Sequence, residues 1–361
     1  MLARLLPRLQ DSFSQQLICL TPAGAVANEI RDLGFPVHSL DISRSLPNPL
    51  AVFRLVSLIR THRPDIVQTW LYHADLLGGL AARIAGVKTL VWNIRNNDLS
   101  RKKTKARTRW VASACARLSH QVPDCIVSCA RSAVETHTQL GYAAEKFVII
   151  PNGFDLSQFY PDASARLSVR TELGLPSGAP LIGLIGRFDP QKNHEGFIQA
   201  AHLVHQSRRD AHFLLAGRGV NAGNTALSEW ISQAGLRGSV HLLGERSDIP
   251  RLNHALDVVV SSSSYGEAFP NVLGEAMACG VPVVATDAGD AALILQGTGR
   301  VVPRGDMTGL ANACLAMLEM NGVEREKLGM AARQRIAECF EISMIARQYA
   351  SLYSSLLTSN S

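Results

Sequence analysis

The feature that most constrains the fold is a regular alternation of short apolar runs with longer segments whose apolar residues recur at helical spacing. Strands that alternate with helices in this way form a parallel sheet covered by helices on both faces. The predicted strands are Gln16 to Leu20, Val37 to Leu40, Ile66 to Leu71, Thr89 to Ile94, Cys125 to Cys129 and Phe147 to Ile150, then Leu181 to Ile185, His212 to Ala216, Val240 to Leu243, Val258 to Ser261 and Pro282 to Ala285.

The alternation restarts after Asn152 and Gly153, which divides the chain into two domains. A chain of 361 residues also exceeds what one hydrophobic core usually supports. We expect an α/β fold with two doubly wound, Rossmann-like domains, over residues 1–155 and 156–338, and a C-terminal helix over 339–361 that packs back on the first domain. Two such domains place a central cleft at the carboxyl ends of their strands, where ligands bind.

The N-terminus departs from this pattern. A doubly wound domain opens with an apolar strand and a glycine-containing turn, whereas this chain begins with Leu2, Leu5, Leu6 and Leu9, spaced as one face of a helix. The first strand of the N-terminal domain is therefore missing from the pattern.

Cysteine usage and motif content exclude several classes of protein. The seven cysteines include no CxxC pair, which argues against a disulfide framework and a zinc site. The apolar stretch over 276–286 has about half the length that a membrane-spanning helix needs. The chain has no Walker loop, complete dinucleotide fingerprint, nucleophile elbow or cluster of histidines. We therefore expect a cytoplasmic enzyme that uses no metal and no cofactor.

Positive charge is concentrated in the first half of the chain. Residues 1–150 hold 19 Lys and Arg against 10 Asp and Glu, whereas residues 151–361 hold 17 against 20. A solvated helix face and contact with an anionic partner both explain the densest run. Because no nucleic-acid motif accompanies it, we expect an anionic membrane surface or a phosphate-bearing acceptor, and no nucleic acid. The run consists of Arg101, Lys102, Lys103, Lys105, Arg107 and Arg109.

The strongest candidate site is the segment 261–280, which follows a predicted strand. Pro270 suits the first turn of a helix and Gly280 suits its end. The backbone amides of Asn271, Val272 and Leu273 are then unpaired first-turn donors, which can bind a diphosphate. Glu267 precedes this helix and Glu275 lies within it; a carboxylate accepts hydrogen bonds from sugar hydroxyls and stabilises a developing oxocarbenium ion. For Glu275, compensation of the helix dipole is an alternative.

A second candidate segment, 181–194, leads from a strand through a loop into a helix. It carries Arg187 and Lys192, and two fixed cations neutralise a departing nucleotide diphosphate. Surface ion pairing explains either residue taken alone. Gly217, directly after a later strand, allows a backbone to approach a ligand, and a simple turn explains it equally well.

Together these segments resemble glycosyltransferase family 4, a family of retaining enzymes with the GT-B fold. The resemblance rests on GEAFPNVLGEAMACGVPVVATD from Gly266, GRFDPQKNH from Gly186 and IPNGFD from Ile150, and it extends over nearly the whole chain. It implies that Arg187 and Lys192 bind the donor diphosphate. It also implies that Glu275 holds the ribose, that Glu267 contacts the transferred sugar, and that the sugar and phosphate are held by Phe269, Pro270, Asn271, Val272 and Leu273.

The resemblance implies further roles at less closely matched positions. Glu245 and Arg246 would frame the base, and Arg95 or Asn96 would replace a histidine that many members direct at the donor sugar. The implied reaction retains the anomeric configuration and needs no metal. In it, the leaving phosphate oxygen accepts the proton of the attacking hydroxyl.

Within the family, the chain is most similar to bacterial enzymes of surface polysaccharide and lipopolysaccharide biosynthesis. We expect it to move a hexose or hexosamine from a UDP- or GDP-sugar to a lipid-linked saccharide acceptor at the inner face of the cytoplasmic membrane. Two alternatives stay open. One is a nucleotide-sugar 2-epimerase of the same architecture, and the other is a nucleotide-sugar-binding protein of low or no activity because of the missing strand.

Overall fold

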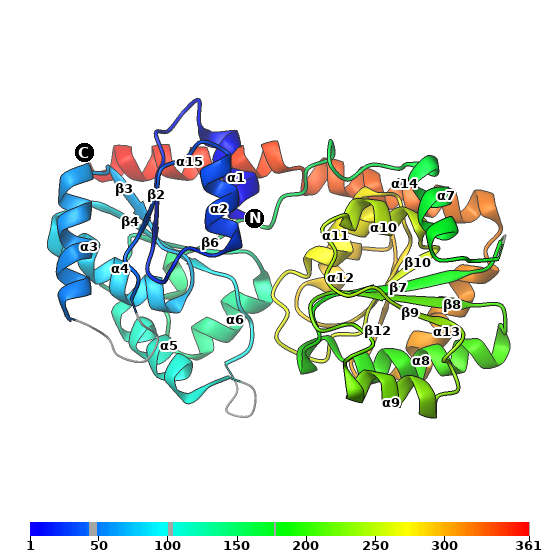
Figure 1. Ribbon diagram of the computed structural model, residues 1–361. Helices are drawn as coiled ribbons and strands as arrows, with labels where there is room; N and C mark the ends of the chain where they lie inside the picture. The colour runs from blue at the N-terminus through cyan, green and yellow to red at the C-terminus, as the bar shows by residue number, and fades with distance from the viewer. Residues whose placement is uncertain (43–48, 100–103, 177, 361) are drawn as a thin grey trace. The chain divides into compact units, whose positions relative to one another are not determined.

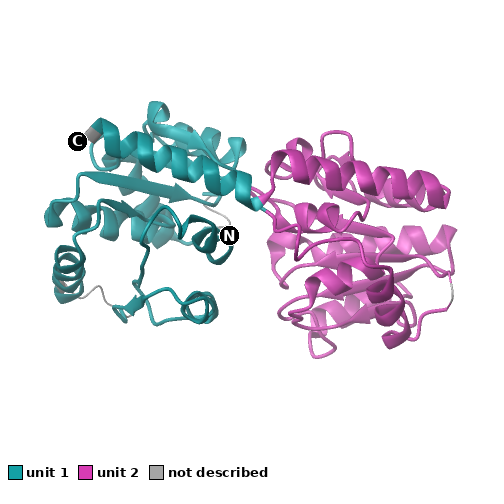
Figure 2. Cartoon of the chain, turned by 90° about the horizontal axis from the view of Figure 1, so that it is seen from above, with its two compact units in different colours: residues 1–153, 342–361 teal, residues 154–341 magenta. Residues whose placement is uncertain are grey.

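The computed structural model describes residues 1–42, 49–99, 104–176 and 178–360. The chain forms two compact units, coloured separately in Figure 2: unit 1 comprises residues 1–153 and 342–361, and unit 2 comprises residues 154–341. The second unit starts at Phe154, whose buried ring packs on Phe269 and whose amide donates to the Phe340 carbonyl. Among the described helices, none has the length and apolar character needed to span a bilayer.

The strands of unit 1 are all parallel, as predicted from the alternating pattern, and they form two sheets. A two-stranded sheet pairs β1 with β2, and a four-stranded sheet has the order β3-β4-β5-β6. The strand bounds are β1 Leu17–Cys19, β2 Val37–Ser39, β3 Ile66–Gln68, β4 Thr89–Ile94, β5 Cys125–Ser128 and β6 Phe147–Ile149.

Helices cover both faces of the four-stranded sheet, because alternate residues of a strand point to opposite faces. Leu90 and Trp92 of β4 pack with α3, α4 and α5, whereas Val91 packs with α1 and α15. The first element is the helix that the leucine spacing predicts, and it packs against α15 (Figure 1). The helices of unit 1 are α1 Leu2–Leu9, α2 Ala25–Asp32, α3 Pro49–His62, α4 Tyr72–Ala85, α5 Ala106–Leu118, α6 Arg131–Gln139, the short 3-10 helix η1 Ala144–Lys146, and α15 Ile342–Asn360.

Unit 2 contains a six-stranded parallel sheet with the order β12-β11-β10-β7-β8-β9. In sequence order, β7, β8 and β9 extend the sheet to one side, and β10, β11 and β12 then extend it to the other side of β7. The topology therefore reverses between the neighbouring strands β7 and β10, which is where ligands bind in doubly wound sheets. The strand bounds are β7 Leu181–Ile185, β8 His212–Ala216, β9 Val240–Leu242, β10 Val258–Ser261, β11 Val283–Thr286 and β12 Arg300–Val302.

The core of unit 2 lies between this sheet and the helices that connect its strands. On one face, Leu184, Phe213 and Val260 pack with Phe197 of α8 and Leu310 of α13. The helices are α7 Ala163–Glu172, η2 Pro190–Lys192, α8 His194–Ser207, α9 Thr225–Gln233, α10 Ile249–Ala255, α11 Asn271–Ala278, α12 Ala291–Leu295, α13 Met307–Glu319 and α14 Gly322–Cys339.

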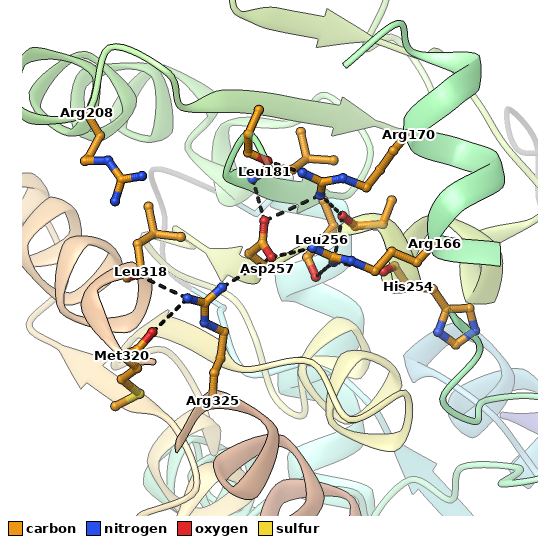
Figure 3. Close-up of polar contacts among 12 residues, drawn as sticks. Arg166, Arg170, Leu181, Arg208, His254, Leu256, Asp257, Leu318, Met320 and Arg325 are labelled. Carbon is orange, nitrogen blue, oxygen red and sulfur yellow. Dashed lines mark hydrogen bonds and ion pairs between the residues drawn. The ribbon is translucent and has the colours of Figure 1, made fainter. Parts of the chain in front are cut away.

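A buried carboxylate links helices to the amino end of the unit 2 sheet (Figure 3). Asp257, directly before β10, accepts hydrogen bonds from Arg166 of α7 at 2.7 Å and from Arg325 of α14 at 3.4 Å. It also accepts from Arg170 at 3.5 Å and from the Leu181 amide at the start of β7 at 2.8 Å. All three guanidinium groups donate to backbone carbonyls as well. These contacts fix α7 and α14 to the edge of the sheet opposite the loops that follow β7 and β10.

Candidate functional site

The candidate site of unit 2 lies where the loops leave the carboxyl ends of β7 and β10. The loop after β7 passes through η2 into α8, and the loop after β10 leads into α11. The two predicted segments, 181–194 and 261–280, are therefore neighbours because their strands pair in the sheet.

An ion pair joins the two loops. Lys192 Nζ lies 2.6 Å from Glu267 Oε1, and the two side chains are only 17% and 10% exposed. Ser263, at the carboxyl end of β10, donates to the same oxygen at 2.9 Å. A mostly buried ion pair has lost part of its hydration, so each charge depends on the other and on added hydrogen bonds.

Serine hydroxyls and backbone contacts hold the loops in register. Ser262 Oγ donates to the Lys192 carbonyl at 2.8 Å, and the Ser264 amide donates to the Gln191 carbonyl at 2.9 Å. Thr286 Oγ1, at the end of β11, donates to the Ser263 carbonyl at 2.6 Å. The serine run Ser261 to Ser264 lies within the predicted segment 261–280, but the sequence alone assigned it no role. The position of these serines is the signal that could have indicated a role, because they directly follow a buried strand and Ser263 lies four residues before the acid Glu267.

Arg187 belongs to the same loop but is more exposed than Lys192. Its side chain is 47% exposed, and its guanidinium donates to Asp189 and to Gln191, both at 3.1 Å. Exposed ion pairs of this kind contribute little free energy, so the guanidinium can exchange partners at low cost. Burial lowers the pKa of His194, which follows in α8, to about 4. His194 is thus uncharged at neutral pH, and Arg187 and Lys192 supply the positive charge of this loop.

The amino end of α11 is where the sequence predicts three unpaired amides that bind a diphosphate. Pro270 is the N-cap residue, and its own side chain makes no capping hydrogen bond. The Leu273 amide, however, donates to the Pro270 carbonyl at 3.2 Å, so the prediction that this amide is unpaired is wrong. The first turn tightens into an i to i+3 bond, which is common at helix ends. Gly280 has φ +73° and directly follows the last turn, as its predicted role at the helix end requires.

The side chains around this turn differ in exposure. Phe269 is buried and its ring lies 6.2 Å from that of Phe154, so it shapes the loop from inside the unit. Val272 is also buried, Asn271 is exposed, and Glu275 is partly exposed on α11.

Glycine at two positions of the site is required by close backbone approaches. A Cβ atom at Gly289 would lie 2.3 Å from the Glu267 carbonyl oxygen, and Gly289 has φ +63°. The strand-end residue Gly217, with φ +150°, would place its Cβ 2.1 Å from the Gly186 carbonyl oxygen. Both glycines let neighbouring loops pack against the segments that carry Glu267 and Arg187.

Arg246 and Glu245, the two predicted site residues after β9, differ in their contacts and exposure. Arg246 donates to both carboxylate oxygens of Asp248 at 2.7 Å and to Glu172 at 2.9 Å. Its guanidinium is thereby held against α7, while Glu245 is exposed. The role of this pair in framing a base stays a prediction.

In unit 1, Arg95 and Asn96 follow β4 at the carboxyl end of the sheet. Arg95 donates to Asn152 Oδ1, and its guanidinium lies 5.1 Å from the centre of the Trp70 ring. Asn96 Nδ2 donates to the Asp98 carbonyl at 3.2 Å. Of the basic run, Lys105 and Arg107 are exposed at the start of α5. Arg101, Lys102 and Lys103 lie outside the described residues.

Family models match both units. The model described as "Glycosyltransferase Family 4" matches residues 1–158, and the model described as "Glycosyl transferases group 1" matches residues 179–320. Among solved structures, the chain is similar to Anabaena Alr3699/HepE in complex with UDP and glucose. The TM-score is 0.85 at 25% identity, over 98% of this chain and 95% of that one.

Two similar curated proteins are bacterial glycosyltransferases. The lipopolysaccharide core biosynthesis mannosyltransferase LpsB of Rhizobium meliloti (strain 1021) is 30% identical over 58% of this chain, and the match spans 61% of that relative's length. The UDP-Gal:alpha-D-GlcNAc-diphosphoundecaprenol alpha-1,3-galactosyltransferase of Escherichia coli is 27% identical over 77% of this chain and 72% of its own.

Proposed function

Since the chain belongs to glycosyltransferase family 4 and has the GT-B fold, we propose that it moves a hexose or hexosamine from a UDP- or GDP-sugar to a lipid-linked saccharide during surface polysaccharide biosynthesis. The complex of the Anabaena relative with UDP and glucose supports a UDP-sugar donor. The name of the Escherichia coli relative, which includes a diphosphoundecaprenol-linked sugar, supports a lipid-linked acceptor.

The observation that carries this proposal is the Lys192–Glu267 pair at the switch point of the unit 2 sheet. In the proposed complex, Lys192 and Arg187 neutralise the donor diphosphate, and the exposed amino end of α11 adds its dipole. Glu267 accepts hydrogen bonds from the hydroxyls of the transferred sugar while Ser263 fixes its carboxylate. Glu275 accepts hydrogen bonds from the ribose hydroxyls.

The proposed reaction retains the anomeric configuration. The acceptor hydroxyl oxygen forms a bond to the anomeric carbon on the face from which the diphosphate leaves, and the bond from that carbon to the phosphate oxygen breaks. The proton of the hydroxyl moves to the same phosphate oxygen. The negative charge that develops on the diphosphate is the largest charge change of the reaction, so cations fixed beside it lower the barrier. With Lys192 and Arg187 in this position, the proposal needs no metal ion.

We also propose that the protein works at the inner face of the cytoplasmic membrane, where a lipid-linked acceptor is presented. The excess of basic residues over 1–150 favours an anionic surface as the partner. The proposed contacts include Arg101, Lys102, Lys103, Lys105 and Arg107.

The test is a donor screen with a synthetic lipid diphosphate-linked N-acetylhexosamine as acceptor. We expect one UDP- or GDP-sugar to give a product larger by one sugar in mass spectrometry, with the anomeric configuration of the donor in NMR spectra. Inverted product would refute the retaining mechanism. Isomerised free donor would indicate an epimerase, and nucleotide binding without any turnover would indicate a binding protein.

A further inference from the structure

The outer side of the α3, α4 and α5 layer in unit 1 exposes large apolar side chains. Phe53 of α3 is 71% exposed, Ile84 of α4 is 58% exposed and Trp110 of α5 is 68% exposed. Leu50 and Leu80 of the same helices are exposed as well. Leaving such side chains in water forgoes the free energy gained by burying them, so a group of them marks a surface that meets another phase or molecule.

These side chains face outward from one layer. The opposite sides of the three helices, including Leu55, Ala82 and Ala112, are buried in a single cluster on β4. Helix α4 packs between α3 and α5 (Figure 1). Phe53 and Trp110 each lie two residues from a buried position on their helices, which is more than half a turn away. We refer to the outward side of α3, α4 and α5 as the α3–α5 face.

The exposed charges that the three helices themselves contribute have one sign. The three helices contain one acidic residue, Asp75, and that carboxyl is fully buried. Arg60 donates to the Ile84 carbonyl at 2.9 Å and so borders Ile84, whereas Arg83 pairs with Asp124, which lies outside the three helices, at 2.9 Å. The arginines of the three helices are Arg54, Arg60, Arg83, Arg107, Arg109 and Arg117.

A pocket lined by both polar and apolar side chains opens at the edge of the same face. It has a volume of about 530 Å³ and lies between β2 and α3. Arg54, Ser57 and Thr61 line it from α3, and His38 and Ser39 line it from β2. A cation with several hydroxyl donors is the chemistry that binds a phosphate group.

We propose that the α3–α5 face docks on an anionic lipid bilayer. Phe53, Ile84 and Trp110 enter the boundary between headgroups and acyl chains, while the arginines bind lipid phosphates and the Arg54 pocket takes a headgroup. An aromatic and aliphatic surface edged by arginine, with no exposed carboxylate on its helices, matches an anionic bilayer, whereas a protein surface presents charges of both signs. This proposal deepens the proposed function by naming the surface that meets the membrane.

Flotation with vesicles tests the proposal directly. Vesicles of phosphatidylcholine alone are compared with vesicles containing about one third phosphatidylglycerol, and the triple variant Phe53→Ser, Ile84→Ser, Trp110→Ser is compared with the native chain. The control replaces similarly exposed apolar residues of unit 2, Leu167→Ser and Val323→Ser. We expect the native chain and the control to float with the anionic vesicles. The triple variant should partition at least about tenfold less, and 0.5 M NaCl should weaken binding of the native chain.

Three outcomes would overturn the proposal: flotation of the triple variant equal to that of the native chain, equal loss in the control, or no flotation of the native chain. A self-association that the triple variant abolishes, in place of vesicle binding, would assign the face to a second copy of the chain. Thermal unfolding of the triple variant verifies that it folds. Transfer to the lipid diphosphate-linked acceptor dissolved in detergent, without a bilayer, separates the two proposals, because it should persist in the triple variant. Its absence from the native chain would refute the proposed function and leave the flotation result intact.

Discussion

Replacing Asp257 with alanine should destabilise unit 2 strongly. The substitution leaves three guanidinium groups and the Leu181 amide without their shared acceptor. Removing one partner of a buried ion pair costs about 3–5 kcal/mol. Arg166 and Arg325 are 39% and 25% exposed and can regain water, whereas Arg170 is only 11% exposed. We therefore expect a loss near the lower end of that range for the ion pairs, with about 1 kcal/mol more for the buried amide.

For a unit of this size, 1 kcal/mol shifts Tm by about 2–4 °C. The loss predicted for Asp257→Ala is therefore a fall in Tm of about 8–16 °C, measured by calorimetry or circular dichroism. Asp210→Ala, which removes an exposed pair with Arg208 in the same unit, is the matched control and should change stability by less than about 0.5 kcal/mol. A fall for Asp257→Ala no larger than that of the control would refute the account of this cluster.

Three further predictions concern pH, packing and metal ions. Burial raises the pKa of the Asp75 carboxyl to about 8 in the folded state, above its value in the unfolded chain. The free energy of unfolding therefore falls as pH rises from the unfolded pKa to the folded pKa. Asp75→Asn should flatten the fall in Tm between pH 6.5 and 8, and an unchanged slope would contradict this. Gly274→Ala would place a Cβ 2.1 Å from Phe154 Cζ, so overpacking should lower the free energy of unfolding by about 1–3 kcal/mol in denaturant titrations. The control Gly238→Ala, which has open space around it, should be nearly neutral in the same titrations. A chelator such as EDTA should leave the rate of sugar transfer unchanged, and recovery of lost activity by added Mg²⁺ or Mn²⁺ would contradict the metal-free proposal.

Much of the architecture could be predicted from local patterns. Thr89–Ile94, Leu181–Ile185 and Val258–Ser261 are strands with the predicted bounds, because each is a compact apolar run of β-branched and aliphatic residues between polar turns. In a doubly wound sheet the first strand pairs with the strand at which the order reverses, which here pairs β7 with β10. This pairing brings Lys192 to Glu267. By contrast, β12 was missed, since its three residues include two exposed ones and show no apolar run.

Side-chain partners were harder to predict than strands. The bond of the Leu273 amide to Pro270 depends on how tightly the first turn of α11 winds, which residue spacing does not encode. Asp257 becomes significant only through Arg166, Arg170 and Arg325, which lie far away from it in the sequence. Arg246 was selected by resemblance alone, and its bonds to Asp248 and Glu172 are contacts that no local pattern in the sequence indicates.

The central claim is that Glu267, held by Lys192, acts on the transferred sugar more than on the nucleotide. The most direct test is the sugar-transfer rate of Glu267→Ala measured together with its Kd for the nucleotide diphosphate, with Glu229→Ala on the exposed side of α9 as control. The account predicts that transfer falls by about 10²-fold or more while the Kd changes only a few-fold, and that Lys192→Ala weakens both. Transfer by Glu267→Ala at the native rate would contradict the account.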